Sequence, residues 1–375
     1  MNAVYKAIDR LSDSATFSGH TTVHSYEGRA IHVLTCGTGR THVLAWSQMH
    51  GNEPTSTLAL IDAMEYLADG KAGAADILDA ITLTAIPMLN PDGYARYDRR
   101  NAQGIDVNRD AQSLISPEAK LLMKAWDDTR PTFALNLHDQ ETRYTSLAPI
   151  TPSLLAMLAP ECTPDKRITP ARQRAMQVIA GVSHDLHDIA HGRIAKYDDI
   201  YTPTAFGDTF MKLGTSSILI EAGSEPGDPQ RTLPRSAMSR AIIASLTQIA
   251  TESYKKHTVQ EYDSLPLNKD FDGYQLLMKG ISVHDTLGDY TTDIAIRRVK
   301  PTCNPEDFAD DLDDFRILNI GDLGDAPAIK TAALQGYTLN GTHQDLYIGR
   351  KADFEVIAPD GNTINVQQIL KSDQH

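Results

Sequence analysis

Cysteine is scarce in this sequence, and long apolar runs are missing from it. The three cysteines, Cys36, Cys162 and Cys303, lie far apart among 375 residues, which excludes a disulfide framework and a cysteine-rich zinc module. No stretch approaches the roughly eighteen apolar residues that a membrane span needs. The first residues, MNAVYKAIDRLSDSATF, lack the apolar core of a secretory signal. We therefore expect a cytoplasmic protein with no membrane partner.

Basic residues are also in the minority. Lysine and arginine number 35 against 49 aspartates and glutamates, so the formal net charge is −14. Such a surface repels phosphate groups, and nucleic acid is not an expected partner. A chain that is 41% hydrophobic and 22% charged is typical of globular proteins. Its length allows a large core within one large domain or two ordinary ones.

Predicted strands and helices alternate through the first two thirds of the chain. Strand-like apolar runs alternate with helix-like periodic segments, which predicts an α/β sheet covered on both faces. The strand candidates are residues 30–35, 42–46, 81–87, 132–137 and 216–220. The helix candidates are residues 1–15, 54–68, 118–127, 171–191 and 234–254.

The pattern changes after residue 256. Short β-type runs (YQLLM, DIAIRRV, DLYIG and DFEVIA) follow among many glycines, aspartates and prolines. We therefore predict a first domain over residues 1–256 and a smaller β-rich domain over residues 257–375. The second domain can be a lid, a dimer interface or a substrate-recruiting module, so a homo-oligomer remains open.

His50 and Glu53 form a His-x-x-Glu pair between a predicted strand and a helix that begins at Pro54. Catalytic zinc takes histidine nitrogens and carboxylate oxygens from three protein ligands. Gly51 would let the backbone bend so that both side chains converge. His138 ends a predicted strand, where open α/β sheets place their sites. Such a pair is common by chance and a lone histidine is more often structural, so the flanking motifs must decide.

The flanking motifs resemble those of the M14 zinc carboxypeptidase family. In chain order they are MHGNEP, NPDGY, RRNAQGIDVNRD, LHD and ILIEAG, across roughly residues 20–255. The resemblance implies a three-layer α/β/α sandwich with a mixed sheet. It also implies one Zn²⁺ per chain, held by His50, Glu53 and His138. The stretches SQMHGNE, NLHDQ and GDTF further resemble a bacterial subgroup.

The resemblance assigns Glu221 as the general base. Zinc lowers the pKa of a bound water to about 7, and a nearby carboxylate can take the proton and return it to the leaving amine. Glu221 follows the apolar run SSILI and precedes Ala-Gly, so we expect its side chain at the edge of the sheet. The alternative is an ordinary surface glutamate at a strand end.

Three arginines in the loop of residues 99–110 predict a carboxylate clamp. Guanidinium groups bind carboxylates through paired hydrogen bonds, and asparagine adds an amide donor. The resemblance implies that Asn108 and Arg109 bind the terminal carboxylate of the substrate. It implies that Arg99 or Arg100 polarises the scissile carbonyl and stabilises its oxyanion. The alignment favours Arg99 as catalytic and leaves Arg100 as a further substrate-binding residue or a solvated side chain.

Two more residues are candidates for substrate contacts. The family has a lid tyrosine in the segment before the base, which makes Tyr201 the first candidate and Tyr197 the second. Either can instead be a half-buried core residue. Asp208, in AFGDTF, falls near the family's specificity pocket. If it points into that pocket, it favours a basic C-terminal residue; otherwise it is a turn aspartate.

The predicted reaction is zinc-dependent hydrolysis of a C-terminal peptide bond. A zinc deacylase of small N-acyl amino acids, similar to succinylglutamate desuccinylase or aspartoacylase, is the alternative, because those enzymes share the His-x-x-Glu pair, the distant histidine and an Asn-Arg pair. The NPDGY stretch and the arginine loop favour the peptidase. A non-catalytic binding protein of the same fold is a third reading, disfavoured because the ligands and the base are all present.

Overall fold

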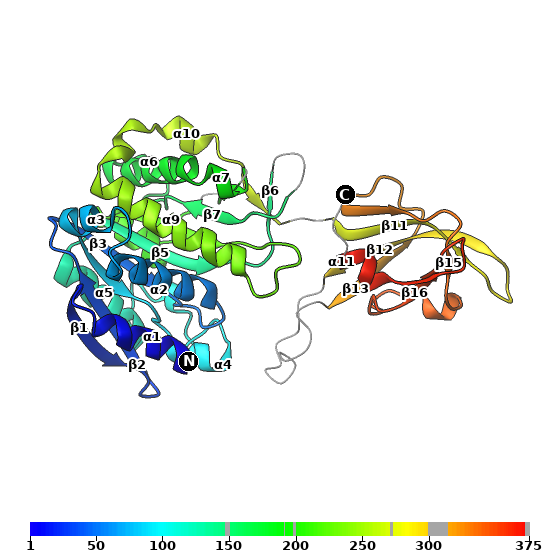
Figure 1. Cartoon of the computed structure of the whole chain (residues 1–375), viewed down its shortest axis with the longest axis horizontal. Helices are drawn as coiled ribbons and strands as arrows, with labels where there is room; N and C mark the ends of the chain where they lie inside the picture. Colours follow the sequence, from blue (N-terminus) through cyan, green and yellow to red (C-terminus); the bar gives the residue numbers. More distant parts are fainter. Residues whose placement is uncertain (147–150, 191, 198–199, 271–272, 299–313, 372–375) are drawn as a thin grey trace. The chain divides into compact units, whose positions relative to one another are not determined.

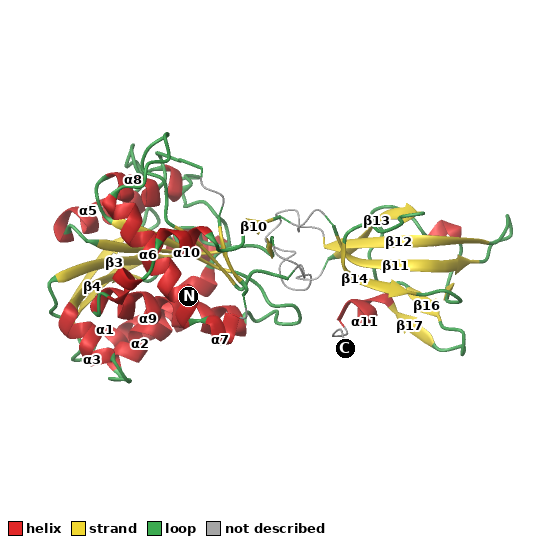
Figure 2. Ribbon diagram, turned by 90° about the horizontal axis from the view of Figure 1, so that it is seen from above, coloured by secondary structure: helices red, strands yellow, loops and turns green. Residues whose placement is uncertain are grey.

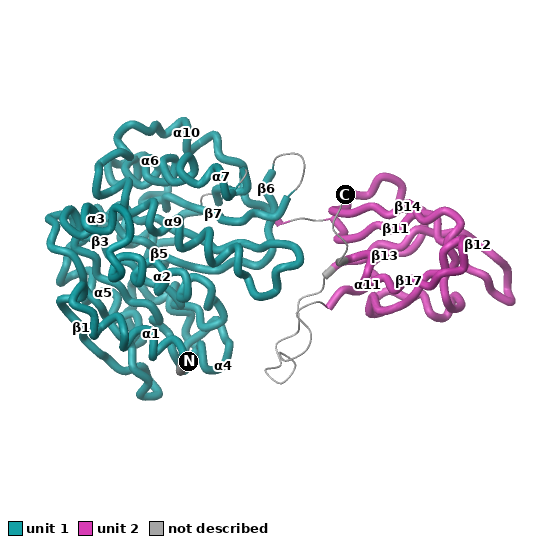
Figure 3. Tube along the Cα trace, in the orientation of Figure 1, with its two compact units in different colours: residues 1–269 teal, residues 270–375 magenta. Residues whose placement is uncertain are grey.

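The computed structural model describes the chain except for residues 147–150, 191, 198–199, 271–272, 299–313 and 372–375 (Figure 1). Cys303, the end of the predicted helix at His191 and the end of the DIAIRRV run thus lie outside the described residues. The chain divides into two compact units, Met1–Lys269 and Asp270–His375, which Figure 3 distinguishes by colour. Within the described part, no helix is long and apolar enough to cross a membrane.

An eight-stranded mixed sheet forms the centre of the first unit. The strand order is β1-β2-β4-β3-β5-β9-β7-β8. The four central strands β4, β3, β5 and β9 are parallel, whereas β1, β2 and β7 join antiparallel neighbours. The bounds are β1 Phe17–His24, β2 Ala30–Cys36, β3 Thr41–Ser47, β4 Ile81–Ile86, β5 Phe133–Asp139, β7 Leu155–Leu158, β8 Ile194–Lys196 and β9 Ser216–Ala222.

Helices cover both faces of this sheet, as Figure 2 shows. One core cluster joins the sheet to α1 Asn2–Ser12, α2 Pro54–Ala68, α3 Ala74–Ala80, α6 Pro170–Asp185 and α9 Thr232–Ala250. A second cluster joins the opposite face to α5 Pro117–Thr129 and α8 Phe206–Lys212. The short helices are α4 Pro91–Arg96 and α7 His187–Ala190. The predicted three-layer α/β/α sandwich with a mixed sheet is therefore confirmed.

The side chains of strand β3 alternate between the two helical layers that cover the sheet. Successive side chains of a strand point to opposite faces. Val43 and Ala45 accordingly join the α2 side, and Leu44 and Trp46 join the α5 side. The Trp46 ring meets Phe210 of α8 edge-on, with ring centroids 5.5 Å apart. A strand that is apolar on both faces is what a central parallel strand requires.

The first unit extends past the predicted domain boundary at residue 256. Residues 257–269 form the helix α10 Val259–Asp263 and the strand β10 Asn268–Lys269. Tyr262 of α10 is buried in the core of the first unit. β10 pairs antiparallel with β6 Tyr144–Thr145. These contacts, which sequence periodicity cannot show, keep the segment with the first unit.

The second unit is β-rich, as predicted. Its seven-stranded sheet encloses a separate apolar core. The run DLYIG is not a strand: it begins at the end of a 3₁₀ turn, His343–Asp345, and leaves Tyr347 and Ile348 exposed. The elements are β11 Tyr274–Val283, β12 Tyr290–Arg298, β13 Phe315–Gly321, β14 Ala328–Ala333, β15 Thr338–Leu339, β16 Glu355–Ile357, β17 Thr363–Asn365 and α11 Val366–Lys371.

Candidate metal centre and active site

The loop between β3 and α2 carries His50 and Glu53. Glu53 is the N-cap residue of α2, and Pro54 is the first residue of that helix. Gln48 adopts a left-handed φ of 52°, a conformation that costs free energy unless surrounding contacts hold it. Its side chain supplies such contacts: Nε2 donates to the Gly51 carbonyl at 3.1 Å, and Oε1 accepts from the Thr57 hydroxyl at 2.8 Å. The buried Gln48 thus fixes the turn that presents both ligand candidates.

The NPDG turn, residues 90–93, packs against this loop. The Asn90 side chain donates to the Met49 carbonyl at 3.2 Å and accepts from Gly93 N at 2.8 Å. Gly51 lies directly against this turn: a Cβ on Gly51 would stand 1.9 Å from the Gly93 carbonyl carbon. Gly51 is therefore needed for close approach of two backbones, and not for the bend that the sequence predicted.

Replacing Gly51 by alanine should destabilise the first unit by about 3 kcal/mol or more, because an added methyl in a closely packed contact forces backbone shifts. The shift would also move His50 and Glu53 apart and weaken metal binding. Gly19→Ala is the matched control, since its Cβ would meet Thr35 at an ordinary 3.5 Å. Urea unfolding and zinc titration of both variants check this. Equal stability of the two variants would contradict the prediction.

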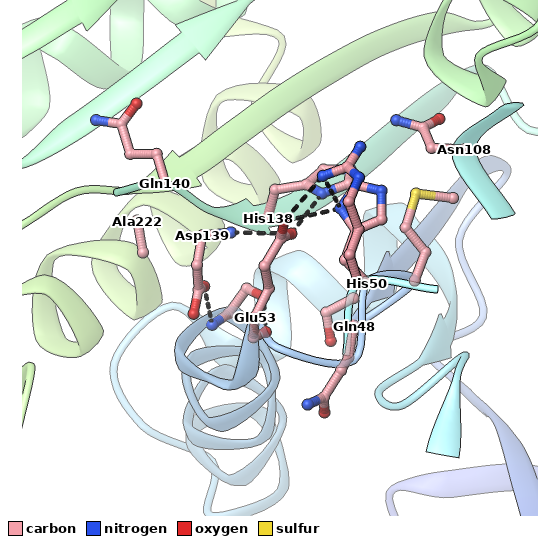
Figure 4. Close-up of polar contacts among 12 residues, drawn as sticks. Gln48, His50, Glu53, Asn108, His138, Asp139, Gln140 and Ala222 are labelled. Carbon is pink, nitrogen blue, oxygen red and sulfur yellow. Dashed lines mark hydrogen bonds and ion pairs between the residues drawn. The ribbon is translucent and has the colours of Figure 1, made fainter. Parts of the chain in front are cut away.

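His50, Glu53 and His138 meet in one buried cluster, as predicted. The Glu53 carboxylate lies 2.8 Å from His50 Nδ1 and 2.7 Å from His138 Nδ1 (Figure 4). The candidate ligand atoms all lie within 4.8 Å of one another. Each of the three residues is at most 9% exposed. Parallel pairing of β3 with β5 brings the loop after β3 next to the end of β5 and thereby joins ligands 85 residues apart.

The charges of the three side chains in the cluster depend on one another. Burial raises the pKa of Glu53, but the imidazoles of His138 and His50 outweigh burial and hold it well below its usual range. Burial lowers the pKa of His50, yet the carboxylates of Glu53 and Asp106 leave it raised overall. A carboxylate and two imidazoles therefore face one point where positive charge is favoured.

The donor set fits a zinc ion. Two imidazole nitrogens and a carboxylate are the ligands of many catalytic zinc sites, which keep one further position open. The Nε2 atom of His50 meets Asp106 Oδ1 at 3.2 Å, an outer contact typical of metal-binding histidines because it orients the ring. With Nε2 held in this way, Nδ1 of His50 faces the shared point beside Glu53. The three residues can thus hold one metal ion.

Glu221 lies opposite His138 on the neighbouring strand. β5 and β9 pair in parallel, with His138 directly beside Glu221. The Oε2 atom of Glu221 is buried without a hydrogen-bond partner among the described residues. Burial, opposed by the His138 imidazole, raises the pKa of Glu221 to about 8. An unpaired buried carboxylate beside the ligand cluster is available for proton transfer.

Of the two neighbouring arginines, Arg99 reaches the cluster. Its Nη1 donates to His50 Nδ1 at 3.2 Å and lies 3.7 Å from Glu53 Oε1, while Nε donates to Asp106 Oδ2 at 3.0 Å. Arg100 is exposed and donates to the Gly104 carbonyl at 2.9 Å, within its own loop. Arg99 thus contacts the cluster, whereas Arg100 makes no contact with it in the described structure, and the role of Arg99 at the scissile carbonyl stays a prediction.

Asn108 and Arg109 follow Asp106, which contacts His50, in the arginine loop. The Asn108 side-chain oxygen accepts from Phe206 N at 3.1 Å, which ties the arginine loop to the start of α8. Figure 4 shows Asn108 to one side of the ligand cluster. Arg109 is exposed and donates to the Asn108 carbonyl at 2.8 Å. The Arg109 guanidinium remains accessible to a substrate carboxylate. The role of Asn108 and Arg109 as a carboxylate clamp stays a prediction.

Three more predicted residues, Tyr201, Tyr197 and Asp208, come from the segment before β9. Tyr201 is half-buried and makes no side-chain contact with the cluster within the described structure. Tyr197, the second candidate, has its hydroxyl 2.6 Å from Gln140 Oε1, two residues after His138. Asp208 is buried and accepts from Thr202 N at 2.8 Å. Its observed contact holds a loop, and its role in specificity stays a prediction.

Sequence reasoning missed three residues that support the ligands. Asp106 orients His50, and Gln48 fixes the His-x-x-Glu turn. Asp139 accepts from Thr55 N at 2.6 Å and Ser56 N at 2.7 Å, and so caps α2 immediately after Glu53. Asp139 and Asp106 stand inside the quoted motifs LHD and GIDVNRD, so their positions beside ligand and clamp residues were the available signal.

Comparison with known proteins gives a sequence match over the first part of the chain. Residues 4–149 match the family model described as zinc carboxypeptidase. Carboxypeptidase 2 of Trichophyton rubrum is 28% identical over 96 residues, covering 25% of this chain and 18% of the fungal protein. Carboxypeptidase SOL1 of Arabidopsis thaliana is 31% identical over 103 residues, covering 24% of this chain and 21% of the plant protein. The chain thus matches about a fifth of the length of these relatives.

Among solved structures, the fold is similar to a metallo-carboxypeptidase from Pseudomonas aeruginosa in complex with (2-guanidinoethylmercapto)succinic acid. The TM-score is 0.51 at 18% identity, and the match covers 66% of this chain and 68% of that chain. The first unit thus has an α/β fold similar to that of a metallo-carboxypeptidase, with a buried His-Glu-His cluster. Residues 4–149, which match the zinc carboxypeptidase family model, carry all three ligand candidates, His50, Glu53 and His138.

Proposed function

We propose that the first unit hydrolyses a C-terminal peptide bond with a zinc ion held by His50, Glu53 and His138. The observation that carries this proposal is the meeting of three buried ligand side chains with Glu221, which lies beside His138 on the adjacent strand. The zinc carboxypeptidase match supports peptide hydrolysis as the class of reaction.

In this proposal Glu221 transfers the proton, and Arg99 stabilises the negative charge that develops on the substrate. The Glu221 carboxylate takes a proton from the attacking water and returns it to the leaving amine. The Arg99 guanidinium, 43% exposed at the edge of the cluster, stabilises negative charge on the carbonyl oxygen of the substrate. When bound, zinc supplies Lewis acidity and lowers the pKa of water. Asn108 and Arg109 bind the terminal carboxylate in this proposal.

A substrate panel tests the proposal against its deacylase alternative. The purified full chain with zinc is incubated with a mixture of peptides, with acetyl-aspartate and with succinyl-glutamate. Zinc-dependent release of free C-terminal amino acids from the peptides is the expected result. Release of acetate or succinate with intact peptides would favour the deacylase, and no turnover of any of these substrates would contradict both. Comparing peptides that end in Lys and in Phe tests Asp208, since equal rates exclude a basic preference.

Replacing Arg99 by methionine should lower kcat/KM for a peptide by about 100- to 1,000-fold, the usual cost of losing one oxyanion-stabilising group. The loss should fall mainly on kcat, because the interaction strengthens only as charge develops. Arg100→Met removes the same charge from the adjacent position and decides between the two arginines. A larger effect at Arg100 than at Arg99 would reverse the assignment. Steady-state kinetics with a zinc determination for each variant provides the measurement.

A further inference from the structure

The last residues of the first unit lie beside the strand that precedes Tyr197. Lys196 N donates to the Pro266 carbonyl at 2.8 Å, and Ser146 N donates to the Leu267 carbonyl at 2.9 Å. Asn268 then pairs with Thr145 in the short β10–β6 ladder. This segment follows α10 and directly precedes the second unit in the chain. Backbone hydrogen bonds thus hold residues 266–268 beside Lys196, the residue that precedes Tyr197.

A buried amide pair links this segment to the end of β5. Asn268 Nδ2 donates to Gln140 Oε1 at 2.8 Å, and the two residues are 5% and 7% exposed. Gln140 follows His138 by two residues, and its backbone N donates to the carbonyl of Ala222, the residue after Glu221. Figure 4 shows Gln140 and Ala222 close together beyond Asp139. Gln140 is therefore anchored between the two strands that supply His138 and Glu221.

The Tyr197 hydroxyl donates to the same oxygen, Gln140 Oε1, at 2.6 Å. One end of the Gln140 amide accepts and the other end donates, so its orientation decides whether Tyr197 can donate to it. The donor group of Asn268 requires that Oε1 point toward both partners. Burial, and next the negative charge of the Glu221 carboxylate, raise the pKa of Tyr197, which keeps the hydroxyl protonated. With its proton directed to Gln140, the hydroxyl oxygen presents lone pairs to a donor such as a substrate N–H.

We propose that Asn268 is a positioning residue of the active site, which fixes the Gln140 amide and thereby fixes the orientation of the Tyr197 hydroxyl. The proposal rests on the proposed function of the first unit. It makes the segment immediately before the second unit part of the catalytic machinery, beyond the region that carries the family motifs. Without Asn268, the Gln140 amide can rotate and present Nε2 to the tyrosine in place of an acceptor.

The full chain tests this proposal through single substitutions. Asn268→Ala should lower kcat/KM for a peptide by about 10- to 100-fold, because small misplacements of a substrate-contacting group have effects of this size. Asn268→Asp keeps the shape but removes the Nδ2 donor, so it should show a similar loss. Lys269→Ala, at an exposed position of the same strand, should retain the wild-type value. Zinc content should be unchanged in all three variants, because none of the substituted residues touches a ligand.

A double-mutant cycle separates positioning from general stability. In a Tyr197→Phe background the hydroxyl is gone, so Asn268→Ala should cause no further loss of kcat/KM. Losses that multiply, or wild-type kcat/KM in Asn268→Ala, would overturn the proposal. If these variants leave turnover unchanged while Glu221→Gln abolishes it, the positioning role fails and the proposed function stands. An active Glu221→Gln variant would instead overturn the proposed function itself.

Discussion

The Glu221→Gln variant should fold, bind zinc and lose turnover by about a thousandfold or more, at the upper end of what general acid–base catalysis contributes. The amide keeps the size of the carboxylate but cannot take a proton from water. Since Glu221 is absent from the ligand set of His50, Glu53 and His138, metal binding should survive. Burial of the unpaired carboxylate disfavours its charged form, so replacement by a neutral amide should not lower stability.

The measurement combines peptide turnover, zinc content and thermal unfolding of the same preparation. Glu225→Gln is the control on the following loop, where the carboxylate pairs with Arg193. The control should keep near-wild-type kcat, whereas Glu221→Gln should not. If Glu221→Gln remained active with zinc bound, another group would have to move the proton. If it lost zinc, Glu221 would act as a ligand and the assignment of roles would be wrong.

The central strands and the ligands could be predicted from sequence because both leave local signals. β3, β5 and β9 are apolar on both faces, and each ends next to a polar motif residue. The edge strand β1 was missed because residues 17–24 are mostly polar and exposed, with two histidines and four hydroxyl or glycine positions that give no alternation. An edge strand faces water on one side, so its sequence carries little of the core pattern.

The inner details of the site depend on contacts between segments far apart in the chain. Sequence favoured Arg99 over Arg100 through the family alignment alone, because contact with the cluster depends on which side of the loop faces Asp106 and His50. Sequence could not find Asn268, whose partner Gln140 lies 128 residues away. The observed division after Lys269 differs from the predicted boundary at residue 256 for the same reason: Tyr262 and β10 join the first unit through packing with distant segments.

Removal of the metal should abolish turnover and lower the stability of the first unit alone. A ligand that binds only the folded state stabilises it by about 4 kcal/mol when its free concentration is 1,000 times Kd. The Glu53 carboxylate and two imidazoles converge at one buried point. A chelator that removes the metal from this point should therefore abolish that stabilisation. The second unit has its own core and no such cluster among its described residues, so its unfolding should not respond.

His138→Ala gives the matching genetic test. Loss of one of three ligands should remove zinc binding at micromolar concentrations, and with it both turnover and the zinc-dependent rise in unfolding temperature. His184→Ala removes an exposed histidine and should behave like the wild type. Calorimetry of the full chain with and without zinc distinguishes the two units, because only the unfolding transition of the zinc-binding unit should shift. A zinc-dependent shift that persists in His138→Ala would place the metal elsewhere, and a shift confined to the second unit would contradict the assigned site.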